Sequence, residues 1–265
     1  MVKKKKNMLV WVGILLVVVI VLLLVVILRR GSTGYVVDQS SPSACSGQWT
    51  NCVYAFADSG VRATAKPTST SSKTGVWNNY NFSILGSSSI DRVTVRADFF
   101  ASRTSGFLDV FVSGDGGVTY GPAHRVGGNT AERAFSLDVT NDVVWTPSRL
   151  SNANLRVKAT CLKVGGGTNP TCNLDWLPVF VNSTPFDFSV AVSPASESVV
   201  QGSSASATVT VSLLGGVSQS VSLSHSGCPP SATCLFNPSS GSPDYTSTFT
   251  VTTSTSTPTG TYPIS

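Results

Sequence analysis

The sequence is poor in the residues that most enzymes use to transfer protons. It contains only two histidines, His124 and His225, and only two glutamates, Glu132 and Glu197. Glycoside hydrolysis needs two carboxylates facing each other across the scissile bond, and the aspartates are scattered along the chain. The G-x-S-x-G pattern of a nucleophile elbow is also missing. We therefore predict neither an enzyme nor a cofactor.

Metal and phosphate motifs are absent as well. There is no C-x-x-C pair, and neither histidine stands at ligand spacing from a cysteine, so no metal site is predicted. The segment 163–168 (KVGGGT) superficially resembles a phosphate loop, but it lacks the G-K-[ST] order and a following helix. We interpret it as a flexible hairpin tip.

The net charge of +5 does not indicate nucleic-acid binding. Six of the 18 basic residues lie in the first 30 positions, which contain no acid, and the rest of the chain has 12 basic and 13 acidic residues. A nucleic-acid footprint needs clustered Lys and Arg on a folded domain. Nucleic acid is therefore not an expected partner.

The N-terminus combines four lysines, Lys3 to Lys6, with an uncharged apolar run over residues 8–28. As a helix this run would be about 31 Å long, which matches a hydrocarbon core of roughly 30 Å. Cytoplasmic flanks carry the excess of Lys and Arg. Residues 1–30 are therefore predicted to form a basic tip and a single-pass signal anchor through the bilayer, with residues 31–265 outside the cell.

Two alternatives to the anchor remain. A cleaved secretory signal has a shorter apolar region, of about 7–15 residues, and a small-residue cleavage site. The basic run before an apolar helix also resembles archaeal and bacterial type IV pilin leaders, which implies a cut near Asn7 and a filament subunit. The chain departs from that pattern, because no Gly or Ala separates Lys6 from the helix and no Glu stands near its start.

The six cysteines lie outside the predicted span. An even count in an exported chain favours disulfides, although six cysteines allow 15 pairings. Sequence proximity suggests Cys45–Cys52, Cys161–Cys172 and Cys228–Cys234. Each bond would close a short loop and mainly stiffen its own turn.

The external part is predicted to be all-β, because its apolar residues recur with period two. We expect a polar stalk (31–44), a first β-sandwich (45–182), a hinge (183–185) and a second β-sandwich (186–265). In the clearest strand, 90–99, the residues Ile90, Val93, Val95, Ala97 and Phe99 should be buried. Arg92, Thr94, Arg96 and Asp98 should face solvent.

The second domain resembles the immunoglobulin-like repeats of archaeal and bacterial surface proteins. The matching segments are 188–194 (FSVAVSP), 200–202 (VQG), 209–211 (VTV), 227–238 (GCPPSATCLFNP) and 257–262 (TPTGTY). In those repeats another strand follows the Gly-Thr-Tyr segment. The resemblance therefore implies a sandwich that is truncated, or whose last strand comes from elsewhere.

The first domain resembles jelly-roll or concanavalin-like sandwich modules of secreted prokaryotic proteins. The matching segments are 90–96 (IDRVTVR), 113–120 (SGDGGVTY), 145–147 (WTP), 150–157 (LSNANLRV) and 174–176 (LDW). The family is linked to carbohydrate binding and adhesion, which implies a surface glycan or protein as partner.

Few residues stand out as site candidates. Trp77 and Tyr80, beside Asn78 and Asn79, are the aromatic residues most suited to stacking on a sugar. Trp145 and Trp176 lie in strand-like patterns and are expected in the core.

The segment 113–120 resembles the Asp-box of sialidase propellers, which implies that Asp115 and Gly117 form a structural turn. Only one copy is present, whereas a propeller needs several.

Two glycosylation sequons start at Asn81 and Asn182, and the predicted topology exposes both. The sequence as a whole predicts a membrane-anchored extracellular β-sandwich protein for adhesion or binding, with glycans as candidate ligands. The alternatives are the non-catalytic anchor and spacer of a longer surface enzyme, and a pilin-like subunit.

Overall fold

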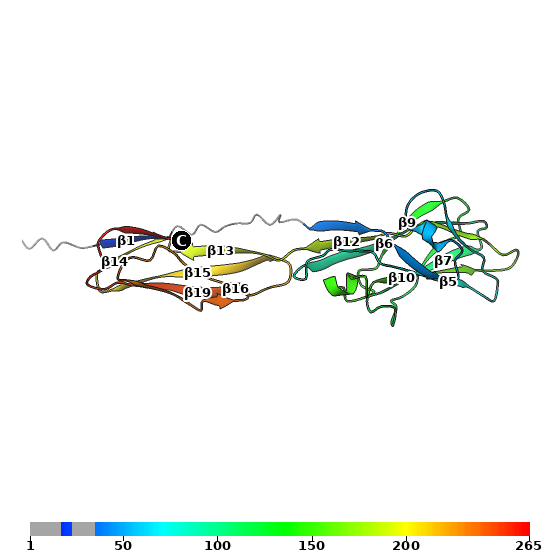
Figure 1. The fold of residues 1–265 in the computed structure, drawn as a ribbon. Coiled ribbons are helices and arrows are strands. Elements are labelled where there is room, and N and C mark those ends of the chain that lie inside the picture. Colours follow the sequence, from blue (N-terminus) through cyan, green and yellow to red (C-terminus); the bar gives the residue numbers. More distant parts are fainter. Residues whose placement is uncertain (1–16, 23–34) are drawn as a thin grey trace, which may run out of the picture. The chain divides into compact units, whose positions relative to one another are not determined.

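A computed structural model describes residues 17–22 and 35–265. Apart from two short 3-10 helices, Cys52–Ala55 and Pro147–Leu150, every helix or strand assigned in these residues is a β-strand (Figure 1). The all-β prediction is therefore confirmed. The described residues form two compact units, one of residues 35–187 and 214–218, the other of residues 188–213 and 219–265 together with the strand Val17–Leu22.

The first unit contains two antiparallel sheets. Its strands are β2 (Val36–Ser40), β3 (Ala44–Gly47), β4 (Ala63–Ala65), β5 (Lys73–Asn78), β6 (Ser89–Ala101), β7 (Gly106–Ser113), β8 (His124–Gly127), β9 (Arg133–Asp138), β10 (Arg156–Lys163), β11 (Cys172–Trp176) and β12 (Val179–Thr184). The five-stranded sheet has the order β3-β5-β10-β7-β8, and the six-stranded sheet the order β2-β12-β6-β11-β4, with β9 also paired to β6.

The alternation predicted for β6 determines how this unit packs. Val93, Val95, Ala97 and Phe99 have no exposed surface, and Arg92 is exposed. Ile90, Thr94 and Arg96 are half-buried, so Ile90 is less buried, and Thr94 and Arg96 less exposed, than predicted. Asp98 differs from the prediction, since only 3% of it is exposed. Its carboxylate accepts two hydrogen bonds from the Arg96 guanidinium, at 2.7 and 2.6 Å, and this pairing compensates for its burial.

The prediction of a stalk is wrong for residues 36–40. Residues 36–40 form β2, which pairs with β12 over five residues at the edge of the six-stranded sheet. Asp38 and Ser40 are half-buried, whereas Val36, Val37 and Gln39 are exposed, as expected for a strand at the edge of a sheet. The first unit therefore begins before Cys45.

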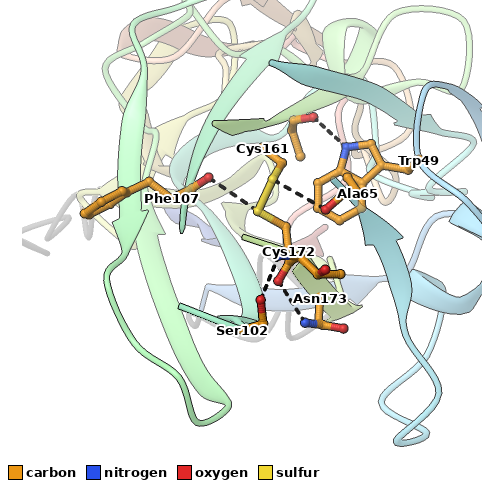
Figure 2. The surroundings of a disulfide bond; sticks show 9 residues. Trp49, Ala65, Ser102, Phe107, Cys161, Cys172 and Asn173 are labelled. Atoms are coloured by element: carbon orange, nitrogen blue, oxygen red, sulfur yellow. Dashed lines mark hydrogen bonds between the residues drawn. A yellow bond between two sulfur atoms is a disulfide. The ribbon is translucent and has the colours of Figure 1, made fainter. Parts of the chain in front are cut away.

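The three disulfides suggested by sequence proximity are confirmed: Cys45–Cys52, Cys161–Cys172 and Cys228–Cys234. The prediction that each mainly stiffens its own turn is wrong for Cys161–Cys172. Cys161 lies on β10 of the five-stranded sheet and Cys172 on β11 of the six-stranded sheet. Figure 2 shows this bond, with Trp49 nearby donating a hydrogen bond from Nε1 to the carbonyl of Ala159 (3.2 Å). The bond ties the two sheets together.

The second unit is a smaller sandwich. Its strands are β1 (Val17–Leu22), β13 (Asp187–Ser193), β14 (Ser196–Val200), β15 (Ser204–Gly215), β16 (Val221–Ser222), β17 (Thr233–Asn237), β18 (Ser240–Gly241), β19 (Tyr245–Thr252) and β20 (Thr261–Ile264). A four-stranded sheet has the order β13-β15-β19-β17, a three-stranded sheet the order β14-β1-β20, and β16 pairs with β18. Its core contains Val199, Val209, Cys234, Phe249, Val251 and Ile264.

Strand β1 differs from the helix predicted over residues 8–28. It pairs antiparallel with β14 and parallel with β20. The other residues of the predicted span, and the lysines before it, lie outside the described residues. Val and Ile favour strands, and the facing edges of β14 and β20 supply partners for both sides of the backbone. In residues 17–22 and 35–265, no helix has the length and apolarity needed to cross a membrane.

Candidate functional site

The two aromatic residues proposed for ligand stacking are core residues. Trp77 and Tyr80 have no exposed surface. Trp77 Nε1 donates a hydrogen bond to the carbonyl of Cys52, and the Tyr80 hydroxyl donates one to the carbonyl of Leu177, both at 3.1 Å. Burial raises the pKa of Tyr80 well above its ordinary value. The prediction that these rings stack on a ligand is wrong, because neither ring reaches the surface.

The other tryptophans differ in exposure. Trp49 is 5% exposed and Trp145 is 9% exposed, with Trp145 Nε1 donating a hydrogen bond to the carbonyl of Val139. The prediction of a core position is confirmed for Trp145 and wrong for Trp176, which is half-buried. The guanidinium of Arg96 lies 4.8 Å from the centre of its ring. One face of Trp176 is thus covered by a cation of the protein itself.

The turn after β7 is held by its own side chains. The Ser113 hydroxyl donates to Asp115 Oδ1 at 2.7 Å and accepts the backbone N–H of Gly117 at 2.9 Å. The backbone N–H of Thr119 donates to Asp115 Oδ1 at 3.0 Å, and the Thr119 hydroxyl donates to Asp115 Oδ2 at 2.5 Å. Gly117 has a φ of +95°, which a side chain would strain. These bonds lower the pKa of Asp115, the Thr119 hydroxyl bond contributing most.

This turn places Tyr120 against β10. The ammonium of Lys158 lies 3.9 Å from the centre of the Tyr120 ring and 4.2 Å from the centre of the Phe111 ring. Phe111 is the direct partner of Lys158 in the pairing of β7 with β10. A lysine between two rings gains cation–π attraction from both. Its ammonium is therefore held in place on the outer side of the five-stranded sheet.

Arg156 lies two residues before Lys158 and faces the same side of the sheet. It donates hydrogen bonds from Nη1 to the carbonyls of Asn152 and Leu155, both at 2.8 Å. Within the described residues, no carboxylate lies within 4.0 Å of Arg156 or Lys158. We call Phe111, Tyr120, Arg156 and Lys158 the Lys158 face. It combines two aromatic rings with two cations that form no ion pair among the described residues.

Neighbouring polar groups on this side of the sheet are paired. Arg125 on β8 donates two hydrogen bonds to the Asp109 carboxylate, at 2.7 and 2.8 Å. The hydroxyls of Thr74 and Thr160 lie 3.0 Å apart. Burial raises the pKa of Tyr120, while the nearby charge of Arg156 acts in the opposite direction, so Tyr120 stays a neutral hydroxyl at pH 7. Such a hydroxyl both donates and accepts hydrogen bonds.

The six-stranded sheet offers a second candidate surface, but its cations are paired. A groove of about 360 Å³ is lined by Val37, Arg92, Thr94, Arg96, Ser136, Phe180 and Asn182. Arg92 lies 3.1 Å from Asp138, and Arg96 is bonded to Asp98. Because both arginines already have carboxylate partners, this groove attracts an anion less than the Lys158 face does.

Three acids come close enough to share a cation. The ligand atoms of Asp58, Glu132 and Asp175 all lie within 4.8 Å of one another. Glu132 accepts hydrogen bonds from the Arg62 guanidinium at 2.9 and 2.6 Å, and Asp175 accepts one from the backbone N–H of Gly60 at 3.0 Å. Protein donors therefore already bind these carboxylates.

The two sequons differ in setting. Asn81 is exposed in the loop between β5 and β6, and its side-chain oxygen accepts a hydrogen bond from Asn152 Nδ2 at 2.5 Å. Asn182 is half-buried within β12, where it lines the groove on the six-stranded sheet. The loop position is the more accessible of the two.

Comparison with known proteins assigns no family. No family model and no curated protein matches the chain. Among solved structures, the chain is similar to the CBM32 of AlyQ in complex with 4,5-unsaturated mannuronic acid, at 12% identity over 54% of this chain and 97% of that chain, with a TM-score of 0.31. It is also similar to TmCBM61 in complex with β-1,4-galactotriose, at 10% identity over 54% and 86%, with a TM-score of 0.29. The xylan-binding module CBM15 matches at 10% identity over 56% and 97%, with a TM-score of 0.28.

Proposed function

We propose that this protein is an extracellular binding protein whose first unit binds acidic polysaccharide through the Lys158 face. The observation that carries the proposal is the ammonium of Lys158 beside the rings of Phe111 and Tyr120. A second cation, Arg156, lies next to it, and no carboxylate of the described residues lies within 4.0 Å of either cation. No catalytic step is proposed.

The chemistry of this face suits a uronic-acid polymer. Aromatic rings offer flat apolar surfaces with a polar edge, which match the C–H faces and hydroxyl rims of sugar rings. Lys and Arg form charge-assisted hydrogen bonds with carboxylates, and Arg can do so with two parallel bonds. A neutral glycan would use the rings and leave both cations unpaired. An acidic glycan satisfies both parts of the face.

The three disulfides support a position outside the cytosol, because such bonds persist in oxidising compartments. The lysines and the apolar run of the N-terminus support attachment to the cell membrane, with residues 31–265 on the external side. The proposed role is thus adhesion to, or capture of, an acidic polymer at the cell surface.

Affinity gel electrophoresis of the purified full-length chain tests the proposal. Native gels would contain sodium alginate or polygalacturonate, with neutral galactan as the comparison polymer. We expect both acidic polymers to slow the protein and galactan to have a much weaker effect. The Lys158→Met variant, which keeps the side-chain length but removes the charge, should lose most of the retardation.

The matched control is Lys66→Met, which removes an exposed lysine just beyond β4, outside the Lys158 face. Relative to a gel without polymer, each polymer should slow it as much as it slows the unmodified chain. Equal retardation by galactan, or equal losses for the two lysine variants, would show that the Lys158 face does not select acidic glycans.

A further inference from the structure

The three-stranded sheet of the second unit is held together by its middle strand. β14 and β20 are not paired to each other, and β1 lies between them. Residues 17–21 of β1 pair with residues 196–200 of β14, and residues 19–22 pair with residues 261–264 of β20. Without β1, two backbone edges would face each other with no hydrogen-bond partner in this sheet.

The strands on both sides of this gap are fixed to the core. Val199 of β14 is 6% exposed and Ile264 of β20 is 1% exposed, and both belong to the buried cluster that contains Phe249. β14 and β20 are therefore positioned by packing as well as by β1. If β1 left, the gap between them would be a slot bordered on each side by N–H and C=O groups that have lost their β1 partners.

We propose that the slot between β14 and β20 is a strand-acceptor site whose ligand is the chain's own segment Val17–Leu22. An added strand gains main-chain hydrogen bonds on both sides, while alternate side chains provide specificity. The sequence of this segment, VVVIVL, has the β-branched composition that such a slot accepts.

When residues 17–22 are bound in the slot, they cannot at the same time span the membrane as a helix. Residues 17–22 are the middle of the apolar run 8–28, and one residue cannot be helical in a bilayer and extended in a sheet at the same time. A molecule whose slot holds its own strand is therefore not anchored by that span. The slot decides between a docked and a membrane-inserted N-terminus.

Disulfide trapping in the full-length chain tests the site, because the six native cysteines are all paired. The matched pairs are Val17→Cys with Val200→Cys, and Val21→Cys with Ser196→Cys, which join direct partners in the β1–β14 register. Direct partners in antiparallel strands have Cα atoms about 4.5–5.5 Å apart, within disulfide range. Both β14 positions are exposed, so these changes spare the core.

The controls use the same four substitutions in exchanged combinations. Val17→Cys with Ser196→Cys, and Val21→Cys with Val200→Cys, are four residues out of register. Their Cα atoms would lie about 13 Å or more apart, which a disulfide cannot bridge. After mild oxidation in intact cells, mass spectrometry of the whole protein population would identify the bridges.

We expect the matched pairs, and not the exchanged pairs, to form a bridge within one chain. Equal yields from matched and exchanged pairs, the absence of any bridge, or bridges that join two chains would each overturn the proposal. The result does not depend on polysaccharide binding, so the glycan proposal can fail separately. A bridge within one chain marks a molecule whose N-terminus is docked, and only the unbridged molecules can be anchored in the membrane by the run 8–28.

Discussion

At the residue scale, two ion pairs on β6 show how burial changes the value of a contact. The side chain of Asp98 is 4% exposed and holds Arg96, whereas the side chains of Arg92 and Asp138 are 56% and 52% exposed. A buried carboxylate depends on its cation, because no water molecules can take the place of the cation if the pair is broken. An exposed pair exchanges its partner for solvent at little cost.

We therefore predict that Arg96→Ala lowers the free energy of unfolding by about 1–3 kcal/mol, the usual cost of leaving a buried acceptor, here the Asp98 carboxylate, without its hydrogen-bond partner. Arg92→Ala should lower it by less than about 1 kcal/mol. Urea unfolding of the two variants at pH 7 measures both. A larger loss for Arg92→Ala would contradict this assignment.

Asp115 should make the stability of the turn depend on pH. Its pKa is lowered in the folded chain by the Thr119 and Ser113 bonds, so its contribution is present above the unfolded pKa of about 3.9 and is lost as the pH falls through the lower folded value. Asp115→Asn should therefore lower the melting temperature at pH 7. The difference from the unmodified chain should shrink below pH 3. Thermal melts at several pH values test this, and an equal difference at pH 7 and below pH 3 would contradict it.

At the element scale, disulfide position matters more than loop length. Cys161 and Cys172 are fully buried and join the two sheets, while Cys45 and Cys52 are half-buried and join β3 to the short helix after it. The sequence separations are 11 and 7 residues, so the loop-closure terms are similar.

Replacing Cys161 and Cys172 together by alanine should cost about 2–4 kcal/mol of unfolding free energy. Replacing Cys45 and Cys52 should cost less, because fewer buried contacts are lost there. Denaturant titration of both double variants tests the order. Equal losses of unfolding free energy would contradict the prediction and would mean that loop closure alone determines how much each disulfide stabilises the fold.

The strand pattern of β6 was predictable from its sequence, and the Lys158 face was not. β6 alternates apolar and polar residues over ten positions, which leaves one choice of buried side. Trp77 was misassigned because β5 contains Gly75 and only two apolar side chains, so its strand gives a weak signal. Phe111 and Lys158 are 47 residues apart, and their contact depends on the register of β7 with β10.

The role of Cys161–Cys172 was hidden for a related reason. Short separation predicts the pair, but not whether the strands before and after the loop belong to the same sheet. That depends on how β10 and β11 are distributed between sheets of five and six strands. The pairing of strands that lie far apart in the chain produces no periodic pattern in a single sequence, so it could not be predicted.

At the scale of the whole molecule, the net charge does not indicate where an anionic ligand would bind. The net charge of +5 reflects the N-terminal lysines and arginines, whereas the proposed ligand site rests on Lys158 and Arg156. Attraction between these cations and an acidic polymer would be screened by salt over about 8 Å at physiological ionic strength.

Binding to alginate should therefore weaken progressively as sodium chloride rises from 50 to 500 mM, with a residual part from ring stacking. Affinity electrophoresis at graded salt measures this, and Tyr120→Ala should remove most of the residual part. Retardation that does not change with salt would contradict a role for the two cations.

The turn from Ser113 to Tyr120 has a practical consequence. Its side-chain bonds join residues at most four positions apart, and Val118 at its tip is 83% exposed. The residue at the tip can therefore be substituted without disturbing the packing of the sandwich. Substitutions at Val118 give protein engineers a way to change what the Lys158 face presents to a polymer, while Asp115 and Thr119 keep Tyr120 in place.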